Sequence, residues 1–172
     1  VVASCCSTAA DGGGARIDVV GTGASYPILA GATATLVVGA LLLFIARRRE
    51  ARVLVLLASC VLLVGVALAV PAVIDVVSPH VYGAPTHRCA FCLLHAEAYY
   101  IGYPLLFVMI VAGSGAISTL VVSFFGRLHP RAASEDASAT SGRLIVASLV
   151  LVALVVFPLV QYALASGTLL AL

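Results

Sequence analysis

Four long runs of apolar residues dominate this sequence and restrict what it can fold into. A hydrocarbon core of about 30 Å needs about 20 apolar residues in a helix that rises about 1.5 Å per residue. Four segments meet that requirement, and they are residues 26–46, 53–74, 100–125 and 144–164. Val- and Leu-rich runs of this length satisfy their backbone groups as helices rather than as barrel strands. The sequence therefore predicts an all-α polytopic membrane protein, a bundle of four transmembrane helices.

The composition leaves little room for a separate soluble domain. Apolar residues make up 63% of the 172 residues and charged residues 9%, whereas ordinary soluble domains have about 45–50% and about 25%. We therefore treat residues 1–172 as a single membrane domain whose main partner is the lipid bilayer. A formal net charge of +2, with no Lys at all, gives no basic patch of the kind that binds nucleic acid.

Arginines are divided unequally between the two sides of the predicted bundle. One side carries seven of them, namely Arg47, Arg48, Arg49, Arg52, Arg127, Arg131 and Arg143. The other side carries Arg16 and Arg88. Because basic residues accumulate in cytoplasmic loops, residues 126–143 are predicted to be a cytoplasmic loop, mobile from Pro130 to Gly142. Residues 75–99 are then predicted to form an outer loop, and both the N-terminus and the C-terminus are predicted to lie outside. The predicted location is a bacterial inner membrane.

The predicted spans contain no Asp, Glu, Lys, Arg or His. Ion-coupled transporters usually need ionisable groups at membrane depth, so this absence argues against that class. Asp75 and Glu97 are interpreted as solvated charges at the interface. Tyr99, Tyr100 and Tyr103 are interpreted as part of an aromatic belt, with stacking on a quinone ring as the alternative.

Small residues predict where the helices pack closely. Gly31, Thr35 and Gly39 recur every four residues in the first span, so they share one helix face and allow a close backbone approach. Ala112 and Ala116, which flank Gly113 and Gly115, suggest the same for the third span. Cys60, inside the second span, is expected to pack as a small apolar residue.

The outer loop holds the most informative pattern in the chain. It reads H-x-C-x-x-C-x-x-H, formed by His87, Cys89, Cys92 and His95, and His80 lies a few residues earlier. One interpretation is thiol–disulfide exchange by Cys89 and Cys92. A helix that begins at this motif would favour the thiolate of the first cysteine, and Arg88 and a protonated His95 would act in the same direction. We therefore predict Cys89, Cys92 and His95 as the catalytic residues.

A second dithiol is available on the same side of the membrane. Cys5 and Cys6 are joined to the first span by a Gly-rich segment, which is flexible enough to reach the outer loop. We predict that at least one of them lies close to Cys89 and Cys92, as an exchange partner or as a shared metal ligand. Val2-Ala3-Ser4-Cys5 also matches a bacterial lipobox, in which Cys5 would be lipidated; alternatively it is the outer end of a preceding helix.

With this dithiol, the chain resembles bacterial membrane thiol oxidoreductases of the DsbB and vitamin K epoxide reductase type. The resemblance rests on the number of helices and on Cys89-Ala90-Phe91-Cys92. It implies a four-helix bundle in which a C-x-x-C at the start of a transmembrane helix works with a second cysteine pair. It also implies that electrons pass to a membrane quinone and that a periplasmic thiol protein is the partner.

Two other classes of function use the same loop. Two thiolates flanked by imidazoles suit zinc, or copper where thiolates dominate, and the candidate ligands are His80, His87, Cys89, Cys92 and His95. The chain could also be a non-catalytic subunit of a larger membrane complex, in which the loop docks a partner. The sequence leaves these alternatives open, together with a structural disulfide between Cys89 and Cys92 that closes an exposed loop.

Overall fold

The fold described below is that of a computed structural model. It describes residues 25–49, 51–82, 89, 91–94, 98, 100–125 and 130–167, without the side chains of Arg52, Phe125 and residues 130–139. Cys5, Cys6, His87 and His95 lie outside the described residues, so the predictions that concern them stay predictions.

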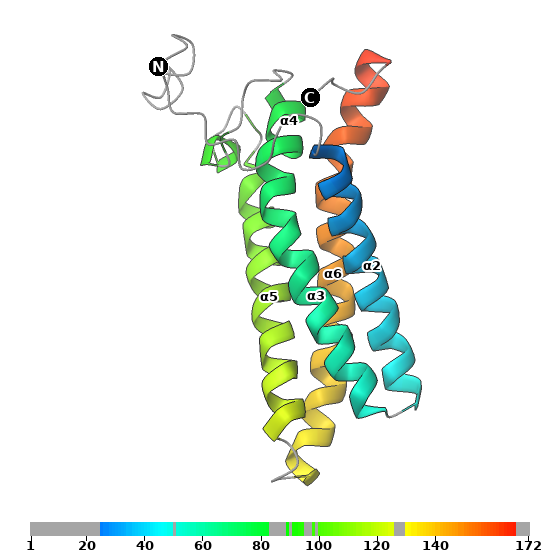
Figure 1. Ribbon diagram of the computed structural model, residues 1–172. Helices are drawn as coiled ribbons and strands as arrows, with labels where there is room; N and C mark the ends of the chain where they lie inside the picture. Colours follow the sequence, from blue (N-terminus) through cyan, green and yellow to red (C-terminus); the bar gives the residue numbers. More distant parts are fainter. Residues whose placement is uncertain are drawn as a thin grey trace.

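Four long helices run side by side along one axis (Figure 1). They are α2 (Ser25–Arg49), α3 (Arg52–Ala72) with its extension, α5 (Gly102–Phe125) and α6 (Pro130–Ser166). Each contains a segment long and apolar enough to cross a membrane, and no strand occurs among the described residues. The prediction of an all-α bundle with four candidate transmembrane helices is confirmed.

The second span is longer than predicted, because α3 does not end near Ile74. It continues through a π-helix, η1 (Val73–Val77), into the short helix α4 (Ser78–Tyr82). Pro71 and Pro79 bracket this π-helix. Proline has no backbone N–H and its ring crowds the preceding turn, which is a recognised setting for a local change of helical pitch. The continuous helix therefore includes Asp75 and His80, which we predicted to lie in the outer loop.

The last helix also begins earlier than predicted. The stretch from Pro130 to Gly142 is the first part of α6 rather than a loop. Proline suits the first helical turn because its missing N–H has no partner there in any case, and the Ala-rich stretch that follows has good helix propensity. The prediction of a mobile cytoplasmic loop in this stretch is wrong.

Glycines opposite leucines set the close packing of the bundle. A Cβ atom at Gly39 of α2 would lie 2.7 Å from the side chain of Leu62 on α3, and one at Gly65 would lie 2.9 Å from Leu36. The same arrangement joins α5 and α6, where a Cβ at Gly115 would lie 2.6 Å from Leu144. The predicted close approach at Gly39 is therefore confirmed, and a side chain larger than hydrogen at any of these positions would require the facing leucine to move.

Apolar side chains cover both the interior and the outer surface of the bundle. The interior contains fully buried residues such as Leu43, Leu62 and Leu151, whereas Phe107 and Phe124 are more than 60% exposed. Hydroxyl groups within the helices bond to backbone carbonyls one turn earlier, as Thr35 does to Gly31 and Ser148 to Leu144. A helix that satisfies its polar groups internally and presents apolar side chains outward is suited to lipid.

Candidate functional site

The segment that carries the two cysteines is attached to the end of the extended α3. The hydroxyl of Ser78 donates to the carbonyl of Cys89 at 3.1 Å, and the hydroxyl of Tyr82 donates to the carbonyl of Cys92 at 2.7 Å. Ser78 and Tyr82 are four residues apart on α4, so they lie on the same face of the helix. The C-x-x-C segment is therefore fixed at both of its cysteines by one helical face.

The start of α5 holds the other side of this segment. Residues Phe91–Leu94 form a single 3₁₀ turn, η2, in which Leu93 belongs to the hydrophobic core. A Cβ atom at Gly102 would lie 2.8 Å from the carbonyl carbon of Leu93, which is closer than real Cβ atoms approach backbone. Gly102 is therefore required for the turn to pack against α5.

The two thiols differ in accessibility. Cys92 is only 3% exposed, Cys89 is partly exposed, and both carry thiols in this structure. An accessible thiol can attack a disulfide of another protein, while a buried thiol nearby can resolve the resulting adduct. The arrangement is suited to two-step exchange.

The expected helix start at the motif is not observed. Cys89 precedes a 3₁₀ turn of four residues, and α5 begins only at Gly102. A turn this short has little of the macrodipole that a long helix develops. The motif therefore stands at a short 3₁₀ turn and not at the start of a transmembrane helix, and the favoured thiolate of Cys89 stays a prediction.

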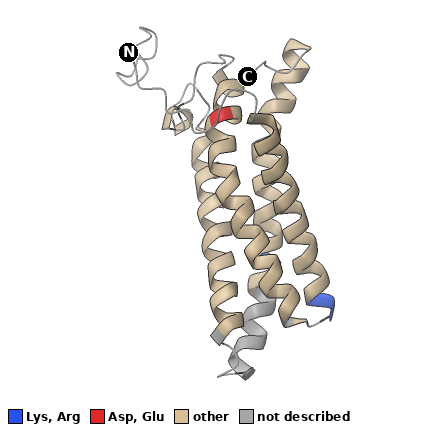
Figure 2. Ribbon diagram, in the orientation of Figure 1, with Lys and Arg blue, Asp and Glu red and all other residues tan. Residues whose placement is uncertain are grey.

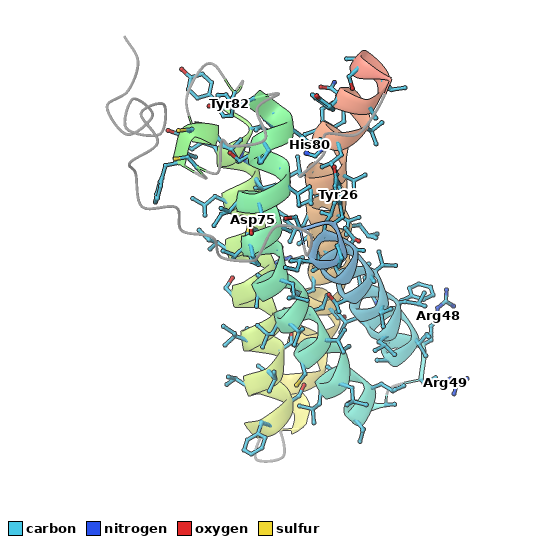
Figure 3. All side chains as sticks on the ribbon, turned by 45° about the horizontal axis from the view of Figure 1, so that its top comes forward. Tyr26, Arg48, Arg49, Asp75, His80 and Tyr82 are labelled. Carbon is cyan, nitrogen blue, oxygen red and sulfur yellow. The ribbon has the colours of Figure 1, made fainter. Side chains whose placement is uncertain are left out.

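His80 points into the bundle, away from the direction of Tyr82 (Figure 3). Its Nδ1 lies 2.7 Å from the carbonyl of Val76, and its Nε2 lies 3.3 Å from the hydroxyl of Tyr26. The ring of Tyr162 on α6 meets the His80 ring edge to face, with centroids 5.3 Å apart. Since a carbonyl can only accept, Nδ1 carries a proton, and in neutral His80 the Tyr26 hydroxyl donates to Nε2.

Asp75 lies one helical turn from His80 and is 1% exposed. It is part of the π-helix η1 and marks the dithiol end of the bundle in Figure 2. The interpretation of Asp75 as a solvated interface charge is wrong, because the second span continues past it and packs it inside. The argument against an ion-coupled transporter assumed that the spans contain no ionisable residue. Because Asp75 belongs to the extended second span, that argument no longer holds.

The remaining predicted positions divide between the surface and the interior. Cys60 is exposed on α3, within a candidate membrane span, while Ser59 and Leu62 on the other face of the helix are buried. Its expected role as a small apolar residue stays a prediction. Tyr100 and Tyr103 are exposed, with ring centroids 6.0 Å apart. Exposed tyrosines at a helix end fit the predicted aromatic belt.

Metal ligands do not gather in the described part of the chain, where no group of three His, Cys, Asp or Glu side chains could hold an ion. His80 uses both ring nitrogens within the bundle, so it would have to break these contacts to bind a metal. A site built from His87, Cys89, Cys92 and His95 remains a prediction, because both of those histidines lie outside the described residues.

Sequence reasoning missed the residues that surround the predicted site. Tyr26 and Tyr162 lie near the ends of the first and fourth spans, where the antiparallel order of the helices brings both to the dithiol end. Comparing the ends of the predicted spans that lie on the same side of the membrane could have identified both tyrosines. Ser78 and Tyr82 carried no signal of their own, because their helix was predicted as a loop.

Comparisons with models of protein families, with curated protein sequences and with solved structures gave no match for this chain. The resemblance to membrane thiol oxidoreductases therefore stays a prediction, and the functional argument depends on the geometry described above.

Proposed function

We propose that this chain is an integral membrane thiol–disulfide oxidoreductase that acts through Cys89 and Cys92. The observation that carries the proposal is the unequal burial of two thiols in one short segment whose backbone is fixed at both cysteines. The hydrogen bonds to the two carbonyls hold the backbone of both cysteines against α4, and the difference in exposure favours Cys89 for attack and Cys92 for resolution.

The exchange consists of two balanced steps. The Cys89 thiolate attacks a disulfide of a partner protein, forming a mixed disulfide and releasing one partner thiolate. The Cys92 thiolate then attacks the Cys89 sulfur, which releases the second partner thiolate and leaves a Cys89–Cys92 disulfide. The same steps run in reverse oxidise a partner dithiol and leave Cys89 and Cys92 reduced.

In the oxidising direction the dithiol must be regenerated as a disulfide. This releases two electrons and two protons, which a membrane quinone would accept, as the resemblance to the DsbB type implies. Among the described residues, Tyr100 and Tyr103 offer exposed aromatic rings beside this end of the bundle. Cys5 and Cys6 are the proposed route between the dithiol and a partner.

The distribution of charge supports an orientation with the dithiol outside the cytoplasm. Arg47, Arg48 and Arg49 lie at the end of the bundle opposite α4, as Figure 2 shows. By the tendency of basic residues to stay in the cytoplasm, the dithiol end faces the periplasm of a bacterial inner membrane. Disulfide exchange is compatible with that compartment.

The test is to trap the mixed disulfide. A Cys92→Ser protein in which Cys5, Cys6 and the exposed Cys60 are also replaced by serine is purified, reduced and treated with glutathione disulfide, and its intact mass is measured. We expect one stable glutathione adduct on Cys89, since the resolving thiol is absent. The protein with both Cys89 and Cys92 should instead release glutathione and form the internal disulfide.

The control is Cys89→Ser, which should form adducts at least about tenfold more slowly because Cys92 is buried. Equal rates for the two variants would contradict the proposal. Reduced protein that binds one zinc ion per chain and forms no adduct would instead assign the loop to metal binding.

A further inference from the structure

A groove on the outside of the bundle lies between α5 and α6. Its volume is about 600 Å³. Phe107 and Val111 of α5 form one wall, and Val146 and Val150 of α6 form the other. Phe107 is 67% exposed and Val146 61% exposed, so the groove opens toward the surroundings of the bundle.

Two guanidinium groups close one end of this otherwise apolar groove. Arg143 of α6 and Arg47 of α2 both line it, and none of the acidic side chains that the structure describes does. The guanidinium of Arg47 lies against α6 at Gly142, which has no side chain. A Cβ atom built at Gly142 would lie 3.1 Å from the Nη1 atom of Arg47. Arg47 directly follows the apolar run of α2, and Arg143 directly precedes that of α6. Both charges therefore lie at the same boundary between apolar and polar residues.

We propose that this groove binds an anionic phospholipid, with an acyl chain between α5 and α6 and its phosphate on Arg47 and Arg143. Acyl chains fit an apolar groove that opens to lipid, and guanidinium groups bind phosphate oxygens in a bidentate manner. Basic pockets between transmembrane helices are suited to anionic headgroups. A zwitterionic headgroup carries its own cation, which two nearby guanidinium groups repel.

The test uses the full chain in lipid nanodiscs that contain phosphatidylglycerol and phosphatidylcholine with the same acyl chains. Native mass spectrometry counts the lipids that stay bound after release from the disc. We expect one phosphatidylglycerol to be retained in preference to phosphatidylcholine. Since one basic residue near the surface changes affinity by about fivefold, Arg47→Gln plus Arg143→Gln should weaken retention by about thirtyfold.

The matched control for charge is Arg48→Gln. Arg48 belongs to the same turn of α2, but its guanidinium lies 5.2 Å from the ring centroid of Phe44 and does not line the groove. The matched control for shape compares Val146→Trp, inside the groove, with Leu149→Trp, which is exposed on α6 outside it. Only Val146→Trp should reduce retention.

Three results would overturn the proposal. The first is equal retention of the two lipids by the unaltered chain. The second is an unchanged preference in the double arginine variant while circular dichroism shows that it is folded. The third is displacement of the lipid by millimolar glycerol phosphate, which would indicate a site for a free phosphate instead.

Discussion

The two ends of the bundle use polar residues in opposite ways. At the dithiol end, Asp75, Ser78 and His80 are buried, and hydroxyl groups on α4 fix the backbone of the cysteine segment. At the arginine end, Arg47, Arg48 and Arg49 are exposed, and Arg48 lies against a phenylalanine ring. One end therefore buries its polar side chains, and the other exposes positive charge to its surroundings. The first end suits the proposed thiol–disulfide exchange, and the second suits the proposed binding of an anionic headgroup.

The largest expected contrast separates Cys89 from Cys60. In a chain with Cys5 and Cys6 replaced by serine, a membrane-impermeant maleimide added to reduced, intact cells should label Cys89. Cys60 should stay unlabelled because its exposed position lies within the second candidate span, which faces lipid rather than water. Mass mapping of labelled peptides measures both sites. Labelling of Cys89 only after the membrane is broken would place the dithiol end in the cytoplasm.

Gly102→Val should loosen the dithiol end without affecting the arginine end. The new side chain would collide with the backbone of Leu93, and overpacking of this kind typically costs about 1–3 kcal/mol. We expect a lower thermal unfolding midpoint and at least tenfold faster alkylation of Cys92.

The control for this experiment is Gly113→Ala on the same helix. A Cβ atom there would meet Val66 at 3.7 Å, an ordinary contact, so stability and alkylation should change little. Equal effects of the two substitutions would show that the packing of Leu93 against Gly102 does not hold the segment.

His80→Phe should destabilise the interior of the dithiol end by about 1–3 kcal/mol, because the carbonyl of Val76 loses a buried donor and the hydroxyl of Tyr26 loses an acceptor. Tyr26→Phe should cost about 1 kcal/mol, since it removes only one of these hydrogen bonds. Thermal unfolding in the same detergent compares the two. A His80→Phe protein as stable as the original would mean that these bonds do not stabilise the bundle.

Tyr82→Phe should have the smallest effect of the four. It removes the hydrogen bond to the carbonyl of Cys92, worth about 1 kcal/mol, and alkylation of Cys92 should accelerate by about fivefold. Tyr100→Phe, at an exposed ring, serves as the control and should leave the rate unchanged. If both variants behave alike, the fixed position of Cys92 depends on Leu93 and not on the tyrosine hydroxyl.

The sequence by itself determined the class of protein and the number of its helices. Length and apolarity are local properties, because each helix satisfies its own backbone hydrogen bonds whatever its neighbours are. The close approach at Gly39 was also readable, since residues four apart on a helix share a face. The same locality explains the error at Ile74, where Asp75 was expected to mark the end of a span.

Only the tertiary structure decided what the second span does beyond Ile74. From its own segment alone, a charged residue such as Asp75 is expected at the membrane interface. Its burial, however, depends on which helices surround it. Here α2 and α6 place Tyr26 and Tyr162 around His80, and the π-helix carries Asp75 into the interior. The attachment of Cys89 and Cys92 to Ser78 and Tyr82 likewise joins residues ten or eleven positions apart. Such pairs arise from the folding of a loop back onto a helix, which neither periodicity nor composition records.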